Sequence, residues 1–277
     1  MRIQLFSDLH LERYPDFRPL ILPGIDVLVL AGDIGSYQPG TRLETHDFGL
    51  ERFSPHQSEL AGVTVLFIPG NHEFDGFEHD QAYARLRATC ERLGIVWLDR
   101  EIHTIGQVRF VGTTLWSDFD ALAQRETEPA RQLQQRTKAF RAANYYLGKN
   151  STLKNGAPVL AEGWRDMALA CQAWLRAALA TPFDGKTIVV THFAPSLLSA
   201  DPRYGVTPGT AGFCNGLDEL FALADIWMHG HLHCLNDYVV EGRGEQGGWS
   251  CRVIANPLGY LSKGEQEGFR PDLVIEL

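Results

Sequence analysis

The sequence predicts an α/β fold whose strands pair mainly in parallel in the first half of the chain. One observation is a series of short runs rich in Val, Ile and Leu, about five residues long, which suit buried strands. A second is that helical patterns separate these runs in the first half. The length of 277 residues is enough for a sizeable core in one large domain.

The predicted strands share branched apolar residues and end in polar or glycine-containing turns. They cover Arg2–Phe6, Asp26–Ala31, Val63–Ile68, Val108–Gly112, Thr187–Thr191, Ile226–Met228, Asp237–Val240, Arg252–Ala255 and Asp272–Leu277. The strands after Ile226 have no long helices between them, so we expect antiparallel pairing in that part.

Two segments repeat apolar residues at the three- and four-residue spacing of an amphipathic helix, namely Asp80–Leu93 and Trp164–Leu179. The stretch Asp120–Leu147 also suits a helix, but its Gln and Arg content predicts greater exposure. We therefore expect a single domain over residues 1–277 with a mainly helical insertion at about 119–182.

Composition excludes several classes of protein. A formal net charge of −9 disfavours binding to long nucleic acids through their phosphates. The sequence has no run of about 18 apolar residues, so we expect no membrane span. The five cysteines are scattered and odd in number, which favours reduced thiols, and the N-terminus does not resemble a signal peptide. Together these features predict a cytoplasmic protein.

Residues that can bind metal follow five of the predicted strands. They are Asp8 and His10, Asp33, Asn71, His192, and His231 with His233. The carboxyl ends of strands form the edge of an α/β sheet where ligands bind, so we expect these side chains to meet.

Spacing and chemistry support a metal site. In an extended chain, residues two apart point to one side, so Asp8 with His10 can present two ligand atoms to one pocket. Oxygen and imidazole ligands without thiolate suit Mn, Fe or Zn at a hydrolytic site. The candidates exceed the needs of one metal, which favours two ions roughly 3.5–4 Å apart that share a carboxylate. Each motif alone has an ordinary structural explanation, such as a turn at Gly32-Asp33.

Taken together, Asp8-x-His10, Gly32-Asp33, Gly70-Asn71-His72-Glu73, a lone His192 and Gly230-His231-x-His233 resemble the calcineurin-like metallophosphoesterase superfamily. The resemblance implies a four-layer αββα sandwich of two mixed β-sheets flanked by helices. It implies that one metal is bound by Asp8, His10 and His233, and the other by Asn71, His192 and His231. It also implies that Asp33 bridges the metals and that His72 is the acid near the leaving group. Residues 114–118 and 255–260 further resemble a little-studied bacterial branch.

This resemblance implies a dinuclear metal-dependent phosphoesterase. A hydroxide bridging the two metals would attack phosphorus in line, and His72 would protonate the departing alkoxide. We expect a small phosphodiester or phosphomonoester as substrate. The diester is favoured because the phosphate-gripping Arg that many relatives carry shortly after the bridging Asp is missing here. The alternatives are a non-catalytic interaction scaffold with the same fold, and a nuclease.

Several further residues are candidates for substrate contact or support. His46 and Tyr37 lie in the long loop 35–52, and Trp116 follows a strand, so each could face substrate, although aromatic residues there also commonly pack. The loop 194–216 is long enough to be functional as well. Glu73 could orient an imidazole or lie on the surface, and His229 fits a packed core position.

Overall fold

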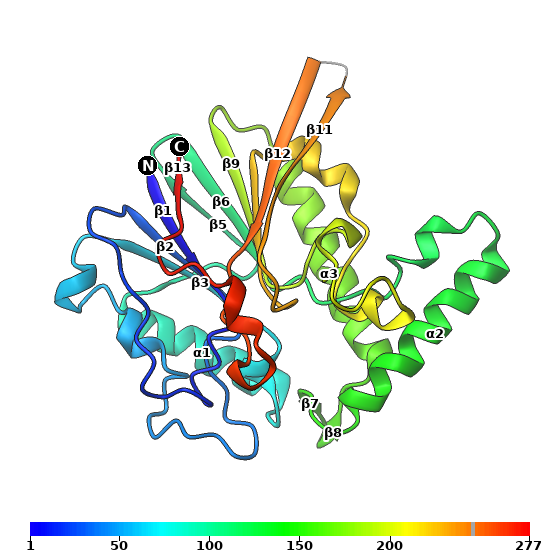
Figure 1. The fold of residues 1–277 in the computed structure, drawn as a ribbon, viewed down its shortest axis with the longest axis horizontal. Helices are drawn as coiled ribbons and strands as arrows, with labels where there is room; N and C mark the ends of the chain where they lie inside the picture. Colours follow the sequence, from blue (N-terminus) through cyan, green and yellow to red (C-terminus); the bar gives the residue numbers. More distant parts are fainter. Residues whose placement is uncertain (245–246) are drawn as a thin grey trace.

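The computed structural model describes residues 1–244 and 247–277 and contains two large β-sheets (Figure 1). The first sheet has the strand order β13-β1-β2-β3-β4 and the second has the order β11-β12-β10-β9-β6-β5. The first sheet comprises β1 (Arg2–Phe6), β2 (Val27–Ala31), β3 (Thr64–Ile68), β4 (Val96–Trp97) and β13 (Val274–Glu276). The second comprises β5 (Glu101–Ile105), β6 (Val108–Thr113), β9 (Lys186–Thr191), β10 (Ile226–His229), β11 (Asn236–Gly244) and β12 (Gly247–Ala255).

Both sheets are mixed. Strands β1 to β4 pair in parallel, and β13 joins β1 antiparallel. In the second sheet β6, β9, β10 and β12 are parallel to their neighbours within that set, whereas β5 and β11 are antiparallel to theirs. Antiparallel pairing after Ile226 is therefore confirmed for β11 and β13 but wrong for β10 with β12. The chain reverses once between β10 and β11 and again in the β11–β12 hairpin, so β12 regains the direction of β10.

Helices cover the sheets as the hydrophobic periodicity predicts. Helix α1 (His79–Leu93) buries Leu86 and Cys90 beside the first sheet, and α3 (Ala161–Ala180) buries Ala168 and Leu175 against the second. These boundaries agree with the predicted ones to within three residues. The observed architecture of two mixed sheets flanked by helices confirms the expected fold class.

The helical part of the chain also contains a third helix, α2 (Pro129–Leu147), which extends away from the sheets (Figure 1). Of its side chains only Ala139 and Leu147 are buried, in agreement with the exposure expected from its polar composition. A two-stranded hairpin, β7 (Leu153–Lys154) with β8 (Ala157–Pro158), connects α2 to α3. The description of residues 119–182 as an insertion in a single domain stays a prediction.

The core between the sheets explains why the strands are continuously apolar. Leu5 and Val29 of the first sheet and Phe110 and Val190 of the second belong to one buried cluster. Neighbouring positions face the helices instead, so the central strands, such as β2 and β9, are covered on both sides. In the part of the chain that the structure describes, no helix is both apolar and long enough to cross a bilayer.

Candidate metal centre

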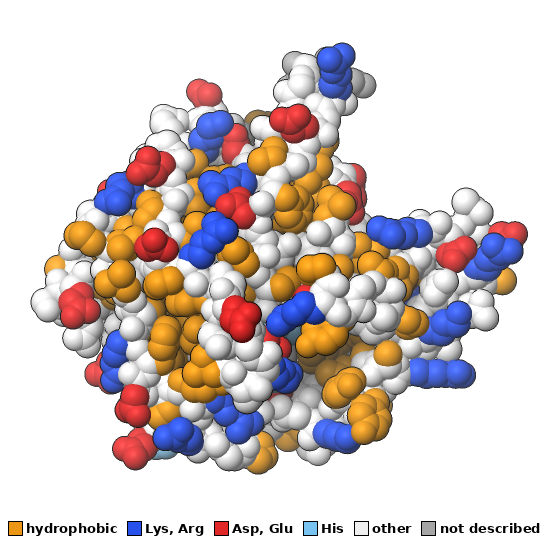
Figure 2. All heavy atoms as spheres, viewed as in Figure 1, with side chains coloured by type: hydrophobic (Ala, Val, Ile, Leu, Met, Phe, Trp, Pro, Cys, Tyr) orange, Lys and Arg blue, Asp and Glu red, His pale blue; other side chains and the backbone are white. Residues whose placement is uncertain are grey.

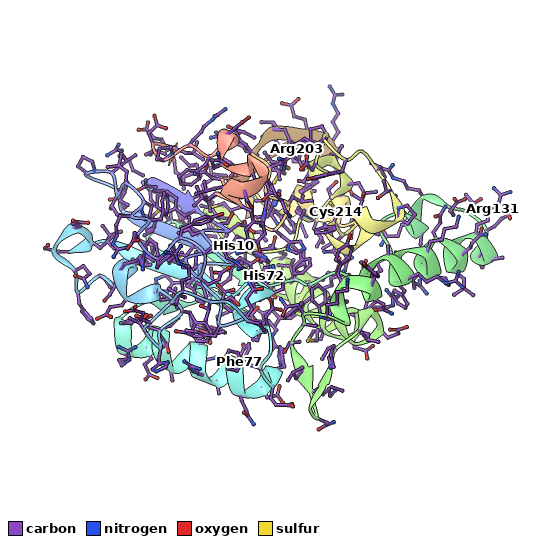
Figure 3. All side chains as sticks on the ribbon, turned by 60° about the horizontal axis from the view of Figure 1, so that its bottom comes forward. His10, His72, Phe77, Arg131, Arg203 and Cys214 are labelled. Carbon is purple, nitrogen blue, oxygen red and sulfur yellow. The ribbon has the colours of Figure 1, made fainter. Side chains whose placement is uncertain are left out.

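Five strand ends bring the predicted ligands together. Two groups of potential ligand atoms form, each with its members within 4.8 Å of one another. The first group contains Asp8, His10, Asp33 and His233, and the second contains Asp33, His192 and His231. Asp33 belongs to both groups, which is the position expected for a shared carboxylate. Figure 3 shows His10 in the interior of the molecule, close to His72.

The spacing of the donor atoms fits metal coordination. Nε2 of His10 lies 3.0 Å from Nε2 of His233, and Nε2 of His192 lies 3.2 Å from Oδ2 of Asp33. Two ligand atoms, each about 2.1 Å from one ion and at right angles, would be about 3 Å apart. Oδ1 of Asn71 lies 3.3 Å from Nε2 of His192, so the side-chain amide of Asn71 lies beside the second group.

Two buried polar atoms of the cluster have no hydrogen-bond partner in the described part of the chain. They are Oδ2 of Asp33 and Nε2 of His231. A buried polar atom without a partner costs about 1–3 kcal/mol, so natural proteins rarely leave one without compensation. Cations at the cluster would satisfy both atoms, and the residues present therefore fit a pair of metal ions.

The backbone is strained at most of the predicted ligands. Asp8, His10, Asp33, His231 and His233 have φ values of 52°, 47°, 53°, 72° and 49°, in the left-handed region. This conformation costs non-glycine residues on the order of 1 kcal/mol each and tends to occur at functional sites. Here it turns each side chain off the end of its strand and into the cluster.

Glycines allow the strand ends to approach one another. A Cβ atom on Gly70 would collide with the side chain of Asp33, and one on Gly32 would collide with the ring of His192. Gly32 and Gly70 therefore each make room for a predicted ligand that comes from another strand.

Hydrogen bonds orient three of the predicted imidazole ligands, those of His10, His192 and His233. Nδ1 of His233 contacts Glu265 at 2.6 Å, Nδ1 of His10 contacts Glu12 at 3.1 Å, and Nδ1 of His192 contacts the carbonyl of Ala31 at 2.8 Å. In each ring Nδ1 is engaged by an acceptor, so Nε2 is left to face the cluster, as in ligating histidines.

The carboxylates of the cluster are held in the ionised form that binds metal. Burial raises the pKa of Asp8, but the hydrogen bond and charge of His233 outweigh it and lower that pKa to about 2. For Asp33 burial also raises the pKa, and the surrounding His192, His72 and His10 lower it well below the ordinary value.

Glu73 binds the backbone and not an imidazole, and it is buried and not on the surface. Its carboxylate accepts hydrogen bonds from the backbone N–H groups of Asp33 (3.1 Å), Ile34 (2.6 Å) and Gly70 (2.7 Å). Burial and then the charge of Asp33 raise the Glu73 pKa to about 8, while these donors act in the opposite direction. One carboxylate thus connects the loops that follow β2 and β3.

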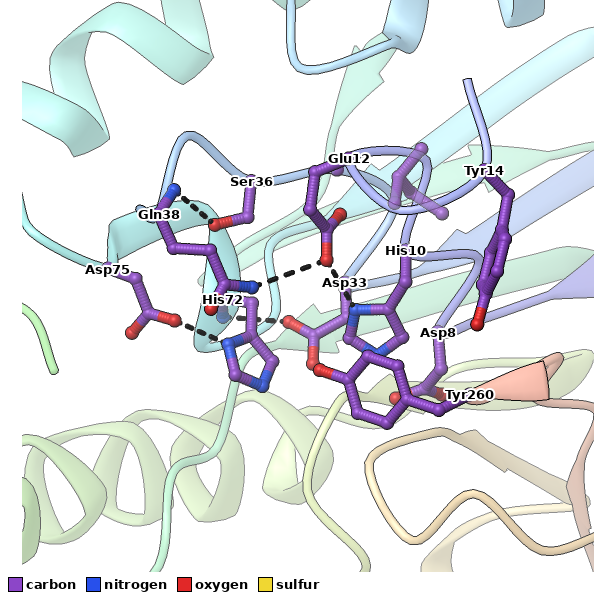
Figure 4. A network of polar contacts seen from close by, with 12 residues as sticks. Asp8, His10, Glu12, Tyr14, Asp33, Ser36, Gln38, His72, Asp75 and Tyr260 are labelled. Atoms are coloured by element: carbon purple, nitrogen blue, oxygen red, sulfur yellow. Dashed lines mark hydrogen bonds and ion pairs between the residues drawn. The ribbon is translucent and has the colours of Figure 1, made fainter. Parts of the chain in front are cut away.

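His72 lies beside the cluster with a carboxylate partner of its own. Its Nδ1 contacts Oδ2 of Asp75, and its backbone N–H donates to Oδ1 of Asp33 at 2.8 Å (Figure 4). Burial lowers the pKa of His72, but the charges of Asp75 and Asp33 outweigh it and raise that pKa to about 10. Cations in the adjacent cluster would act in the opposite direction, because they favour the neutral imidazole.

A chain of hydrogen bonds connects His10 to His72. Glu12, which contacts His10, accepts a hydrogen bond from the side-chain amide of Gln38 at 3.3 Å. The side-chain oxygen of Gln38 in turn accepts from the side-chain amide of Asn150 at 3.2 Å. The same Asn150 amide donates to Asp75 at 2.6 Å. Sequence reasoning did not identify Asp75, Asn150 or Glu265. Only Asp75 carries a local signal, since it is an acid three residues after His72.

The three candidate substrate residues lie in different environments. Tyr37 is half-buried and donates its hydroxyl to the carbonyl of Thr45, and His46 is exposed in the same loop. Trp116 is only 3% exposed and packs against Phe193. Contact of these three residues with substrate stays a prediction. His229 is buried, and its Nε2 contacts the hydroxyl of Ser199 at 2.9 Å, which confirms its packed position.

The long loop 194–216 borders the cluster. Phe213 is 44% exposed, and its ring centre lies 5.0 Å from that of His231. Arg203 pairs with Asp201 and donates to the backbone carbonyl of His233 at 3.0 Å. Sequence reasoning singled out this loop for its length but not these residues.

Comparison with known proteins identifies the family. Residues 1–235 match the family model described as calcineurin-like phosphoesterase. A relative, Uncharacterized protein L509 of Acanthamoeba polyphaga mimivirus, is 21% identical over 264 residues, which are 90% of this chain and 83% of that protein.

Two solved structures are similar to this fold. Phosphopantetheinyl Hydrolase (PptH) from Mycobacterium tuberculosis has a TM-score of 0.65 at 18% identity, covering 96% of this chain and 92% of that one. A dimetal phosphatase from Danio rerio has a TM-score of 0.46 at 15% identity, covering 92% and 86%. The first of these supports the fold alone, given its low identity.

The family match covers most of the chain and includes every predicted ligand. The protein belongs to the calcineurin-like phosphoesterase family, as the sequence motifs predicted. Family membership and the two ligand groups support metal-dependent hydrolysis of phosphoesters.

Proposed function

We propose that this protein is a cytoplasmic phosphoesterase with two metal ions, which hydrolyses a small phosphate ester. The observation that carries the proposal is the pair of ligand groups that share Asp33. One ion would be held by Asp8, His10 and His233, and the other by Asn71, His192 and His231. Manganese, iron or zinc suits this set of carboxylate, amide and imidazole donors.

The ions would supply positive charge that attracts the phosphoryl group and would make water acidic enough to act as a nucleophile near neutral pH. The remaining steps belong to the chain itself. His72 would donate a proton to the leaving oxygen, because its Nδ1 is engaged by Asp75 and its Nε2 is left to carry that proton. Asp75 would stabilise the protonated imidazole and fix its orientation.

A phosphodiester is favoured over a phosphomonoester. The residues immediately after Asp33 are Ile34, Gly35, Ser36 and Tyr37, which provide no cationic side chain for phosphate. A diester carries one negative charge fewer than a fully ionised monoester, so it needs less compensation from a protein whose net charge is −9.

The test is an assay of purified protein loaded with Mn²⁺ against bis-p-nitrophenyl phosphate and p-nitrophenyl phosphate. We expect turnover of both, with a higher kcat/KM for the diester. A phosphopantetheinyl ester belongs in the same panel, since the Mycobacterium tuberculosis protein is named for that group. Absence of turnover in protein shown to contain metal would contradict the enzymatic proposal and favour the scaffold alternative.

One observation favours a nuclease as a second candidate. Residues 129–160 contain no Asp or Glu, and several of their cations are exposed on α2, including Arg131, Lys138 and Arg141. Figure 2 shows Lys and Arg side chains along this arm of the molecule, and Figure 3 places Arg131 far from His72. Cleavage of a single-stranded oligonucleotide, lost when Lys138 and Arg141 are replaced by Glu, would support this candidate.

A further inference from the structure

The segment after β12 folds back over the metal centre. The backbone N–H of Leu258 donates to the carbonyl of Ser7 at 3.1 Å, and that of Gly259 donates to the carbonyl of Asp8 at 3.0 Å. Gly259 has a φ of 69°, and a side chain there would collide with Glu265. These contacts fix the next residue, Tyr260, directly over the end of β1.

The Tyr260 ring lies against two predicted ligands of one metal. It stacks on His10, with ring centres 4.3 Å apart and an interplanar angle of 24°, and meets His233 edge-on at 5.0 Å. Its backbone N–H donates at 2.8 Å to Oε2 of Glu265, the same atom that contacts Nδ1 of His233. These contacts fix the position of the Tyr260 ring relative to His10 and His233.

The Tyr260 hydroxyl is directed into the site. Figure 4 shows the ring over His10 with its hydroxyl extending toward Asp33, near His72. The hydroxyls of Tyr14 and Tyr238 each form a hydrogen bond with a protein group, at 2.7 and 2.8 Å. In the described ranges of the chain we find no such partner for the hydroxyl of Tyr260. A phenol at neutral pH is a hydrogen-bond donor, so this donor is available to a ligand.

We propose that Tyr260 is a catalytic residue whose hydroxyl donates a hydrogen bond to a non-bridging oxygen of the phosphoryl group. This inference rests on the proposed phosphoesterase function. Negative charge on the non-bridging oxygens must be stabilised as the ester reacts, and a donor fixed in advance does so without reorganisation. Tyr260 thus takes the place of the absent phosphate-binding Arg. A neutral donor also suits a diester, which carries less charge.

The test is the Tyr260→Phe variant, which keeps the stacked ring and removes only the hydroxyl. We expect unchanged metal content and about 10²–10³-fold lower kcat, by analogy with other transition-state donors. The loss should be equal for esters with good and poor leaving groups, because the hydrogen bond is to an oxygen that does not depart. Calorimetry should show inorganic phosphate binding to the Mn²⁺-loaded variant several-fold more weakly than to the parent protein.

The matched control is Tyr145→Phe, since Tyr145 is 63% exposed on α2, and it should match the parent protein in both measurements. Turnover and phosphate affinity within twofold of the parent in Tyr260→Phe would overturn the proposal. Loss of metal would also overturn it by assigning Tyr260 a packing role. A loss confined to poor leaving groups would instead make it an acid. If the parent protein hydrolyses no ester, the proposed function fails, and phosphate binding still decides whether Tyr260 contacts the anion.

Discussion

Asn150 donates a 2.6 Å hydrogen bond to Oδ2 of Asp75, the same oxygen that contacts Nδ1 of His72. Asn150 lies just after α2, so the end of the exposed helix is connected to the proposed acid through one carboxylate. Asp75 is 3% exposed, so removal of either partner would leave its buried charge with only one of these two contacts.

Replacing Asp75 by Asn should lower turnover without loss of metal. Asparagine keeps the shape but removes the charge that favours protonated His72, so we expect kcat to fall about 10–100-fold, as for other partners of functional imidazoles. Asp80→Asn is the matched control, because His79 and Asp80 form a similar pair at 3.0 Å with the carboxylate fully exposed. Equal activity losses in the two variants would contradict the role of Asp75.

Replacing His72 by Ala should affect poor leaving groups most. Proton donation by a side chain is worth about 10²–10⁴-fold when the leaving group needs it, and much less for p-nitrophenolate. Metal content should stay near that of the parent protein, since His72 belongs to neither ligand group. The measurement is a series of aryl and alkyl esters, and equal losses across that series would refute the acid role.

Replacing Asp33 by Asn should disturb both metal sites. Asp33 belongs to both ligand groups, and an amide is a weaker ligand with no charge to share. We expect elemental analysis to show less than half of the metal bound by the parent protein. Asp237→Asn, which alters a carboxylate paired with Arg252 on the surface, is the control and should retain full occupancy. Full occupancy in Asp33→Asn would rule out the bridging position.

Replacing Glu73 by Gln should destabilise the protein. Each side-chain oxygen of Glu73 accepts hydrogen bonds from backbone N–H groups. In Gln one of these oxygens becomes an NH2 group, which is a donor and would face backbone N–H donors. We expect the free energy of unfolding to fall by about 2–4 kcal/mol in a urea titration of the metal-free protein. Glu78→Gln is the control, because Glu78 also accepts from two backbone N–H groups but lies at the surface, and it should lose much less.

Removing metal should also lower stability. Metal that binds only the folded state stabilises it by about 2.7 kcal/mol per site at a concentration 100 times Kd. A chelator should therefore lower Tm by several degrees, and added Mn²⁺ should restore it. A Tm insensitive to both would contradict metal binding at the cluster.

The positions of the proposed ligands could be identified from the sequence because each is marked by its own local pattern. A buried apolar run predicts a strand, and the polar residue that follows it indicates the chemistry of the site at that strand end. Asp8 and His192 could therefore be found without knowing the fold. Pairing between distant segments could not be predicted in this way. Glu265 reaches His233 and Asn150 reaches Asp75 only because the tertiary fold brings them together, and neither carries a motif.

The direction and length of the last strands show the same limit. Strands β11 and β12 each have nine residues, whereas the apolar runs predicted four. Their outer halves contain Glu241, Arg243 and several glycines, because that part of the hairpin projects beyond the sheet (Figure 1). Backbone pairing between β11 and β12 extends both strands into a part of the hairpin where exposed residues leave no apolar pattern in the sequence.

The left-handed backbone at Asp8, His10, Asp33, His231 and His233 has an evolutionary consequence. Selection for the proposed reaction keeps these side chains in a backbone conformation that glycine, or to a lesser degree asparagine, adopts at lower cost. In a descendant released from that selection, the backbone preference would favour mutation to glycine at these five positions. Glycines at the ligand positions would therefore distinguish members of the family that have lost the reaction from members that have changed substrate.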